Sequence, residues 1–268
     1  MSATAGTALI TGASSGIGAV YADRLARRGH DLILVARNRE RLDAVAERIT
    51  TRTGRSVEVL TADLGQAEDL RRVEQVLHSN ADISVLVNNA GFGAVSTLVD
   101  SDVDAMESMI TLNATALTRL TYAFTPGAVS RGGGTVINIG SIVAVVPELL
   151  NGVYGASKAF VLALSQSLRH ELGEKGLRVQ VVLPGATATD FWEIAGTPVE
   201  NLPQEWVMTV DDMVDAALAG LDGGEFVTIP ALPDAELWDA YQAARQALSG
   251  SLSGSQPAAR YRRTSTTR

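Results

Sequence analysis

The 268-residue sequence contains no cysteine, only three histidines, and only two lysines against 20 arginines. Without cysteine there can be no disulfide, no thiolate nucleophile and no thiolate metal ligand. His30, His78 and His170 have no metal-ligand spacing with one another, so we expect no metal site. The sequence also lacks an apolar run of about 18 residues, and it lacks a basic segment leading an apolar one. We therefore expect a cytoplasmic protein without a membrane segment.

Positive charge is scarce and unevenly distributed. The net charge is −8, but residues 249–268 hold four arginines and no acid, so residues 1–248 carry 18 basic against 30 acidic groups, or −12. No basic residue lies between Val179 and Ala244, a stretch that contains twelve acids. Nucleic acid needs clustered cations, which only the tail has, so we expect no nucleic-acid partner. We predict one folded domain at 1–248 and a disordered basic tail at 249–268.

Apolar runs alternate with amphipathic segments along most of the chain. The runs are rich in Val, Ile and Leu, as strands buried on both faces should be, and cover residues 7–11, 31–36, 56–62, 84–88, 135–140, 178–184 and 225–230. Helical patterns cover 16–28, 38–52, 66–78, 102–125, 153–173 and, at the end, 234–248. The alternation predicts a single-domain α/β fold with a doubly wound, mostly parallel seven-stranded sheet and helices on both faces. Residues 186–223 interrupt the pattern and are predicted to form a lid over one edge of the sheet.

A glycine-rich segment, TGASSGIG at residues 11–18, follows the first predicted strand and opens the first helix. Gly12, Gly16 and Gly18 would let a pyrophosphate approach the backbone and rest on the N–H groups of the helix N-terminus. The spacing is G-x3-G-x-G, which differs from the commoner G-x-G-x-x-G. Residues 12–16 also fit the G-x-S-x-G turn of serine hydrolases, but the few residues before Gly12 leave no room for the oxyanion-hole loop. The segment therefore favours a dinucleotide site.

The end of the second predicted strand bears on which dinucleotide is bound. NAD-binding folds usually present an acid there to the adenosine ribose. This sequence has Ala36 and Arg37 at that point and no carboxylate before Glu40. A guanidinium can pair with a 2′-phosphate and stack on adenine. We predict NADP(H), with NAD less favoured; the alternative is that Arg37, Arg39 and Arg41 are only a solvated helix start.

The segment VYGASKAF, residues 153–160, places Tyr154 and Lys158 one helical turn apart on the same face. Their ordinary pKa values, ~10 and ~10.4, make neither a useful acid–base group at neutral pH. Bringing the phenol pKa near neutral takes roughly 3 units, or ~4 kcal/mol, which one ammonium at ~4 Å supplies at an effective dielectric of ~20. The pair is therefore either an activated tyrosine or an ordinary helical packing contact.

Four further motifs occur in order along the chain. They are NNAG at 88–91, Asn113 in a helix, Ser141 after the fifth strand, and LPGATATD at 183–190. With TGASSGIG and the Tyr154/Lys158 pair, they resemble the short-chain dehydrogenase/reductase family in its main form, over residues 7–190. The resemblance implies a Rossmann-like fold in which residues 1–248 are a dinucleotide-binding catalytic domain.

The resemblance also implies a role for each catalytic residue. Tyr154 would be the general acid in carbonyl reduction and the general base in alcohol oxidation. Lys158 would hold the nicotinamide ribose and lower the pKa of Tyr154, and an oxidised nicotinamide would add to that effect. Ser141 would hydrogen-bond the reacting oxygen, and Asn113 would hold a water in a proton relay.

The implied cofactor site draws on every motif. Asp63 would contact the adenine, Asn88 and Gly91 would line the adenosine side, and Thr187 and Thr189 would hold the carboxamide. Ser15 stands where many NADP-using relatives have a basic residue. The full implied set is Gly12, Ser14, Ser15, Gly16, Ile17, Gly18, Arg37, Asp63, Leu64, Asn89, Ala90, Gly91, Tyr154, Lys158, Pro184, Gly185, Thr187 and Thr189.

The resemblance therefore implies an NADP(H)-dependent oxidoreductase, a carbonyl reductase or alcohol dehydrogenase that forms a homo-oligomer, dimer or tetramer, through its two long helices. One alternative is a non-catalytic NADP(H)-binding sensor on the same fold. Another is a sugar-nucleotide epimerase or dehydratase, but those usually show TGxxGxxG and a larger C-terminal domain. Within the predicted lid, residues 186–208 contain Phe191, Trp192 and Trp206, four acids and no cation. They favour a small or medium-sized, mostly apolar carbonyl or alcohol substrate without phosphate.

Overall fold

The computed structural model describes residues 5–262 of the chain. The chain divides into two compact units, one ending at Pro230 and the other beginning at Ala231. Of the predicted tail, residues 263–268 lie outside the described residues, and the division into a domain and a tail stays a prediction. None of the helices within residues 5–262 has the length and hydrophobicity needed to cross a bilayer. The cytoplasmic location also stays a prediction.

The first unit is built on a seven-stranded sheet in the order β3-β2-β1-β4-β5-β6-β7, in which every neighbouring pair is parallel. This confirms the predicted doubly wound sheet. The strand order reverses between β1 and β4, which is where such sheets bind ligands, beyond the carboxyl ends of the strands. The strands are β1 (Thr7–Thr11), β2 (Asp31–Ala36), β3 (Val57–Thr61), β4 (Ile83–Asn88), β5 (Gly134–Ile139), β6 (Leu177–Val182) and β7 (Val227–Thr228).

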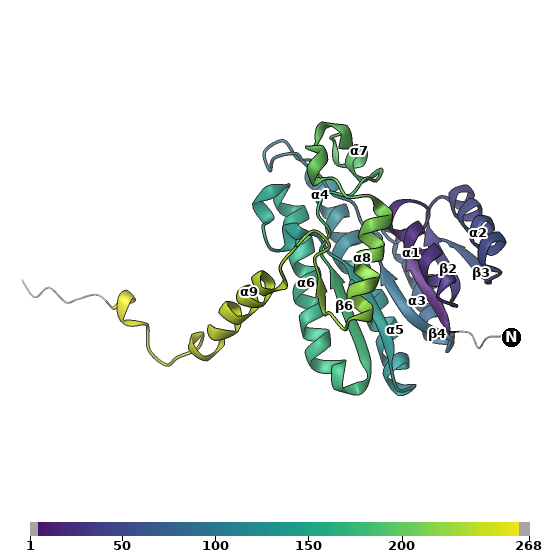
Figure 1. The fold of residues 1–268 in the computed structure, drawn as a ribbon. Coiled ribbons are helices and arrows are strands. Elements are labelled where there is room, and N and C mark those ends of the chain that lie inside the picture. Colours follow the sequence, from purple (N-terminus) through teal and green to yellow (C-terminus); the bar gives the residue numbers. More distant parts are fainter. Residues whose placement is uncertain (1–4, 263–268) are drawn as a thin grey trace, which may run out of the picture. The chain divides into compact units, whose positions relative to one another are not determined.

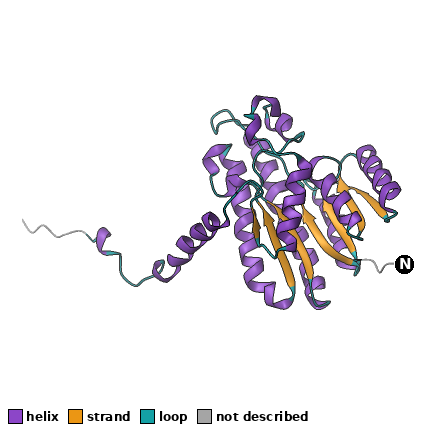
Figure 2. Ribbon diagram, in the orientation of Figure 1, coloured by secondary structure: helices purple, strands orange, loops and turns teal. Residues whose placement is uncertain are grey.

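Helices cover both faces of the sheet (Figures 1 and 2). Because successive strand residues point to opposite faces, Ile10 packs with one helical layer and its neighbour Leu9 with the other. The first layer holds α1 (Gly16–Arg27), α2 (Arg39–Thr53) and α8 (Val210–Asp222). The second holds α3 (Ala67–Ser79), α5 (Leu117–Ser130) and α6 (Gly152–Leu172). The core is therefore two apolar layers separated by the sheet.

The helix predicted at 102–125 is interrupted in the structure. α4 (Val103–Ile110) passes into a π-helical segment, Thr111–Ala116, before α5 begins at Leu117. Short π-helical segments inside α-helices are rare and occur mostly at functional sites. The sequence pattern did not reveal this break, because Thr111–Ala116 contains no glycine or proline to mark it. Asn113, one of the predicted site residues, lies in this segment.

The stretch expected as a lid, 186–223, contains a core helix that the sequence pattern missed. Residues 191–206 form α7 (Phe191–Ala195) and two short 3-10 turns, but α8 begins at Val210. Its Val214 and Leu218 are buried in the first layer. On its surface, Asp215 pairs with Arg24 of α1, and Asp222 pairs with Arg28, the C-cap residue of α1. A lid in this unit is therefore confined to the part of the stretch before α8.

The second unit is short and helical. It consists of α9 (Ala235–Ala247) and the 3-10 turns Ser249–Ser251 and Ala259–Tyr261. The side chain of Asp234 caps α9 by accepting a hydrogen bond from Glu236 N. No residue of α9 is buried. The terminal helix predicted at 234–248 is thus present.

Candidate active site

The glycine segment forms a tight turn between β1 and α1. Gly12 and Gly16 have φ values of +65° and +51°, a backbone conformation that side chains disfavour. A Cβ on Gly18 would lie 2.6 Å from the Asn89 side-chain nitrogen, and a Cβ on Gly16 would lie 3.2 Å from a Thr189 methyl carbon. Each glycine therefore lets another chain segment or a ligand approach the turn closely.

The NNAG segment clamps this turn from β4. The Asn89 side chain donates hydrogen bonds to the carbonyls of Thr11 (2.9 Å) and Gly12 (3.1 Å). Thr11 Oγ1 in turn accepts from the backbone N–H groups of Asn89 and Ala90, both at 3.0 Å. The tips of the two strands at the reversal point are thereby locked together.

Asn88 lies away from the glycine turn. Its side-chain nitrogen donates to Thr121 Oγ1 (3.1 Å) and Asn138 Oδ1 (2.9 Å) in the buried layer between the sheet and α5. Its side chain is therefore engaged in the core, and the groups that line the turn come from Asn89, Ala90 and Gly91. The predicted adenosine contact of Asn88 finds no support in this arrangement.

The turn fits the pyrophosphate of a dinucleotide. Within the described chain, Ser15 is the N-cap residue of α1 and its side chain makes no capping hydrogen bond. The first N–H groups of a 12-residue helix can therefore meet an anion, and the helix dipole favours negative charge there. Ser14 and Ile17 are half-buried within the same turn. The open glycine cradle and the uncapped helix end together match the predicted phosphate site.

A cavity of about 320 Å³ is lined by two of the predicted adenine-side residues. Arg37 and Asp63 line it, together with Gln66, Phe92 and Glu107. Leu64 is buried in the core, so only its backbone can face a ligand. The cavity brings a cation and a carboxylate together at one end of the candidate cofactor site.

Arg37 differs from its two arginine neighbours on α2. Arg39 pairs with Asp43 at 2.8 Å, and Arg41 pairs with Asp190 at 3.4 Å. Arg37 is exposed and makes no ion pair or side-chain hydrogen bond with any residue in the described part of the chain. Among residues 5–262, the guanidinium of Arg37 is the one of these three whose donors have no partner.

The helix that carries Tyr154 and Lys158 begins at Gly152. Its cap is Asn151, whose side chain accepts hydrogen bonds from Val153 N (2.9 Å) and Tyr154 N (3.3 Å). Tyr154 and Lys158 are each only 6% exposed, and Lys158 Nζ donates to the Ile139 carbonyl at the tip of β5 (2.9 Å). The contact with Ile139 places Lys158 at the carboxyl end of β5, and Tyr154 lies one turn before it on α6, as the spacing predicted.

Ser141 and Gly91 complete the surroundings of the pair. Ser141 follows β5, is buried, and lies close enough to Tyr154 to lower the pKa of its phenol. A Cβ on Gly91 would lie 3.6 Å from Lys158 Nζ and 2.8 Å from Asn113 Oδ1. The structure thus brings the four predicted catalytic residues, Asn113, Ser141, Tyr154 and Lys158, into one cluster beside the NNAG segment.

The titration of the pair differs from the sequence-based expectation. Burial raises the pKa of Tyr154 to about 12, and the nearby Ser141 hydroxyl opposes this only in part. Burial also lowers the pKa of Lys158 to about 8. The simple charge estimate omitted the cost of taking both groups out of water, which disfavours the phenolate and the ammonium alike. The chain's own residues therefore keep Tyr154 protonated at neutral pH.

The side chain of Asn113 is buried and makes three hydrogen bonds within the chain. Its side-chain nitrogen donates to the Phe92 carbonyl (2.8 Å) and to Ser157 Oγ (3.1 Å), while its oxygen accepts from Phe92 N (3.1 Å). It therefore ties the loop after NNAG to α6 one residue before Lys158. Both ends of the amide are engaged inside the chain, and the water-holding role stays a prediction.

The segment after β6 closes the site from the other side. The Pro184 carbonyl accepts from Ile142 N (3.0 Å), and Thr187, which is 5% exposed, donates to the Gly185 carbonyl (3.2 Å). Thr189 lies next to Gly16 of the glycine turn. The residues predicted to hold the carboxamide thus lie between the glycine turn and the lid.

Sequence reasoning missed much of the apolar surroundings of Tyr154. They comprise Phe92, Val143 and Leu150, with the lid residue Phe191 packed on the Tyr154 ring. A buried glycine, Gly93, lies beside both rings. The signal available was its position two residues after NNAG, but a lone glycine there does not reveal which side chains pack against it.

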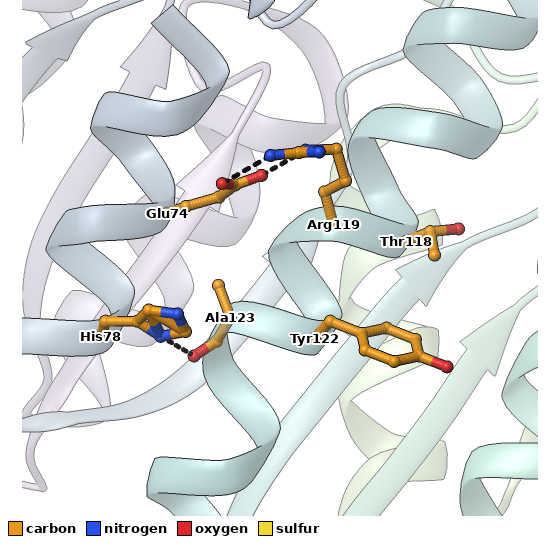
Figure 3. Close-up of a pocket in the computed structure, with 6 residues that line it drawn as sticks. All are labelled: Glu74, His78, Thr118, Arg119, Tyr122 and Ala123. Atoms are coloured by element: carbon orange, nitrogen blue, oxygen red, sulfur yellow. Dashed lines mark hydrogen bonds and ion pairs between the residues drawn. The ribbon is translucent and has the colours of Figure 1, made fainter. Parts of the chain in front are cut away.

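A second cavity, of about 340 Å³, lies between α3 and α5 (Figure 3). Figure 3 shows Glu74 and His78 of α3 facing Arg119 and Ala123 of α5. Glu74 forms a two-point ion pair with Arg119, and His78 Nδ1 is 2.9 Å from the Ala123 carbonyl. These polar groups satisfy one another, and none of the predicted site residues lines this cavity. In the described part of the chain, no group of three or more His, Asp or Glu side chains is placed to hold a metal ion.

Comparisons with known proteins agree with this arrangement. The sequence model of the short chain dehydrogenase family matches residues 6–198. A very-long-chain 3-oxoacyl-CoA reductase of Anas platyrhynchos is 37% identical over 192 residues, which are 70% of this chain. The match spans only 62% of that relative's length.

Two solved structures are more similar. A short-chain dehydrogenase from Sphingobium yanoikuyae, solved in complex with NADPH, is 52% identical with a TM-score of 0.93; the match covers 96% of this chain and 100% of that one. The bulky-bulky ketone specific alcohol dehydrogenase from Comamonas testosteroni is 46% identical with a TM-score of 0.89, covering 97% and 99%.

Proposed function

The chain belongs to the short-chain dehydrogenase/reductase family, and from this premise we propose that it is an NADP(H)-dependent reductase of neutral, apolar ketones, with Tyr154 as the proton donor. The observation that carries the proposal is the buried cluster of Asn113, Ser141, Tyr154 and Lys158 beside an open glycine turn. An oxidoreductase of this family needs both parts: a cradle for the dinucleotide and a positioned acid.

The free guanidinium of Arg37 supports NADP(H) as the cofactor. It lines the same cavity as Asp63, at the end of β2 where the adenosine ribose would lie. A planar guanidinium with unused donors can bind a 2′-phosphate through two parallel hydrogen bonds. The NADPH complex of the Sphingobium yanoikuyae relative supports the same choice. The glycine turn would hold the pyrophosphate, and Thr187 and Thr189 would bind the carboxamide.

The bound cofactor would supply a hydride to the carbonyl carbon of the substrate. As negative charge develops on the carbonyl oxygen, Tyr154 would donate its phenolic proton to that oxygen. A pKa of about 12 keeps the phenol protonated and ready to donate at neutral pH. Ser141 would donate a second hydrogen bond to the same oxygen. In the oxidative direction Tyr154 would act as the base, and because reduction leaves the same phenolate behind, burial disfavours that species in both directions.

Lys158 and Asn113 would set the geometry around the phenol. Lys158 is anchored to the Ile139 carbonyl and sits 5.9 Å from the centre of the Tyr154 ring. From this position its remaining N–H groups would hold the ribose hydroxyls of the cofactor. Asn113 would keep the loop after NNAG and α6 at a fixed separation.

The lining of the site supports an apolar substrate without phosphate. Phe92, Val143, Leu150 and Phe191 surround Tyr154, and residues 186–208 carry four acids and no basic residue. An anionic thioester would meet acidic groups at the lid, where like charges repel. The name of the Comamonas testosteroni relative points to ketones with two large groups, whereas that of the Anas platyrhynchos relative points to an oxoacyl thioester. The charge of the lid favours the former.

The proposal is tested by following NADPH absorbance with paired substrates of equal chain length. One member of each pair is a neutral ketone with a bulky group on each side of the carbonyl, and the other is a 3-oxoacyl-CoA. We expect a higher kcat/KM for the neutral ketone. Faster turnover of the thioester would contradict the substrate class. NADPH binding without turnover of any ketone would favour the non-catalytic sensor instead.

A further inference from the structure

The side chain of Phe191 fills a space beside the candidate acid that is shaped for a flat ring. Its ring centroid lies 5.6 Å from that of Tyr154, with the planes inclined at 45°, and 5.4 Å from that of Trp192, with the planes nearly perpendicular at 87°. The edge of the ring faces Gly93, where a Cβ would lie 2.5 Å from Phe191 Cζ and 2.9 Å from Cε2. This space, bounded by Gly93, Tyr154 and Trp192, is the ring subsite.

The backbone wall of the ring subsite is held on both sides of Gly93. Phe92, before it, donates its N–H to Asn113 (3.1 Å) and accepts from the Asn113 amide at its carbonyl (2.8 Å). After it, the Ala94 carbonyl accepts from Asn151 N, the cap of α6 (3.3 Å). Because both neighbours of Gly93 are tied to the helices that carry the catalytic residues, this wall keeps a fixed place beside Tyr154.

The two neighbouring aromatic residues of α7 differ in how firmly they are held. Trp192 is 8% exposed, and its indole N–H donates to the Thr187 carbonyl at 3.0 Å. The Phe191 side chain is half-buried and has no polar atom, so a rotation about its side-chain bonds toward solvent breaks only apolar contacts. The walls of the ring subsite therefore persist when the Phe191 ring leaves it.

The position of the ring subsite matters because Tyr154 has to meet a carbonyl oxygen at hydrogen-bond distance. Tyr154 is 6% exposed, and the ring packed on it from the lid is that of Phe191. The two substituents of a ketone begin at the carbonyl carbon, so one of them must lie next to the phenol when its oxygen is bound there. The place available to that substituent is the one that Phe191 fills.

We propose that the ring subsite binds one planar aromatic substituent of the ketone, which takes the place of the Phe191 ring, and that Gly93 and Phe191 determine this specificity. The proposal rests on the proposed ketone reductase function and adds the kind of group that lies beside Tyr154. A substrate ring there would make the tilted and edge contacts with Tyr154 and Trp192 that Phe191 makes. Such aromatic pairs are favourable beyond the apolar area that they bury.

The test uses two ketones that differ only in their ring: a benzyl ketone and the cyclohexylmethyl ketone with the same alkyl group on the other side. A methylene separates each ring from the carbonyl, so the reactivity of the two carbonyls is matched. Dissociation constants are measured by calorimetry with the NADP⁺-loaded protein, because the oxidised cofactor has no hydride to transfer.

The two ketones separate a shaped subsite from a merely apolar one. A pocket without a preferred shape would bind the cyclohexylmethyl ketone more tightly, because its saturated ring has more apolar surface. That ring is also thicker and lacks a π-system, so the ring subsite should reject it. We expect the wild type to bind the benzyl ketone about 10-fold more tightly, the scale of one favourable aromatic pair.

Two variants and a matched control assign the preference to this place. Gly93→Ala puts a methyl group into the ring subsite and should weaken binding of the benzyl ketone by about 10-fold, which cancels the preference. Gly152→Ala is the control, since Gly152 is the first residue of α6, near Tyr154, and a Cβ there would meet no described atom within 4 Å. It should keep the preference. Phe191→Ala removes the competing ring and should tighten binding of the benzyl ketone.

The outcomes distinguish the ring subsite from the proposed function on which it rests. Equal affinities of the wild type for the two ketones, tighter binding of the cyclohexylmethyl ketone, or no binding of either would overturn the ring subsite. Weaker binding of the benzyl ketone by Phe191→Ala would overturn it too, because Phe191 would then be a partner of the substrate ring and not its substitute. Preferential binding of the benzyl ketone without its reduction by NADPH would support the ring subsite and contradict the reductase function. NADP⁺ binding, measured in every sample, reports that each variant is folded.

Discussion

The ring of Phe191, from the lid, lies against the ring of Tyr154, with centroids 5.6 Å apart and planes inclined at 45°. Trp192 holds Phe191 from its other side in an edge contact at 5.4 Å. The contact crosses Gly93: a Cβ there would lie 2.5 Å from Phe191 Cζ and 3.2 Å from Tyr154 Cδ2. The missing side chain of one residue thus lets the lid rest on the candidate acid.

We predict that Gly93→Ala displaces Phe191 and lowers kcat for ketone reduction by about 10-fold, since small misplacements of a catalytic group are costly. NADPH affinity should hardly change, because Gly93 adjoins Phe191 and Tyr154 and none of the predicted phosphate-binding residues. Removing the obstructing ring in the double variant Gly93→Ala/Phe191→Ala should restore part of kcat relative to Gly93→Ala alone. Steady-state kinetics of the two single variants and the double variant would measure this coupling. Strictly additive losses would show that Gly93 and Phe191 act independently.

The sheet was predictable because each strand is a short run rich in Val, Ile and Leu between turn residues. In β1, for example, the neighbours Leu9 and Ile10 are buried on opposite faces of the sheet. The sequence order of the motifs also placed Ser141, Tyr154 and Lys158 together correctly. The contact of Phe191 with Tyr154 was not predictable, because it joins segments 37 residues apart in the sequence through a lid whose course no periodicity describes. The predicted lowering of the Tyr154 pKa was wrong in direction, because the shift depends on burial, which the spacing of residues does not reveal.

Cofactor preference should depend on Arg37 and not on its neighbour Arg39. Arg37→Asp removes the free guanidinium and adds a repulsive charge, so NADPH affinity should fall by about 10²-fold, with NADH affinity unchanged or improved. Arg39→Asp is the matched control, because Arg39 already pairs with Asp43 and should affect NADPH affinity little. Dissociation constants by fluorescence titration would decide. Equal affinities of the wild type for NADPH and NADH would contradict the assignment.

Tyr154→Phe should abolish ketone reduction while leaving NADPH binding nearly intact, since only the hydroxyl is lost. Steady-state kinetics and NADPH titration of this variant and the wild type measure both effects.

In the wild type, ionisation of a group with a pKa of about 12 cannot limit the rate near neutrality. The protonated form is the active one in reduction, and it persists below the pKa. The kcat/KM for reduction should therefore show no loss attributable to Tyr154 up to about pH 10. A pH profile that falls with a pKa near 7 and flattens in Ser141→Ala would show that the free enzyme carries a lowered tyrosine pKa after all.

Lys158 should be irreplaceable by arginine, although arginine keeps the positive charge. Burial lowers the pKa of Lys158 to about 8, so its ammonium loses charge as the pH rises past that value, and NADPH affinity in the wild type should weaken there. Arginine would remain charged at every accessible pH. If charge alone mattered, Lys158→Arg would bind NADPH and turn over normally and would lose this pH dependence.

The site around Lys158, however, fits a compact donor. Lys158 is 6% exposed, its Nζ is 2.9 Å from the Ile139 carbonyl, and Gly91 adjoins it closely. A longer planar guanidinium must displace the Tyr154 ring or enter the space of the ribose hydroxyls. We therefore expect Lys158→Arg to lose roughly 10²-fold or more in kcat, the scale of lost acid–base catalysis. The measurement is kcat and NADPH affinity against pH for the wild type, Lys158→Arg and Lys158→Met. Near-normal kcat in Lys158→Arg would refute the requirement for a compact donor. A wild-type NADPH affinity that stays flat through pH 8 to 10, like that of Lys158→Met, would refute the role of the ammonium in holding the cofactor.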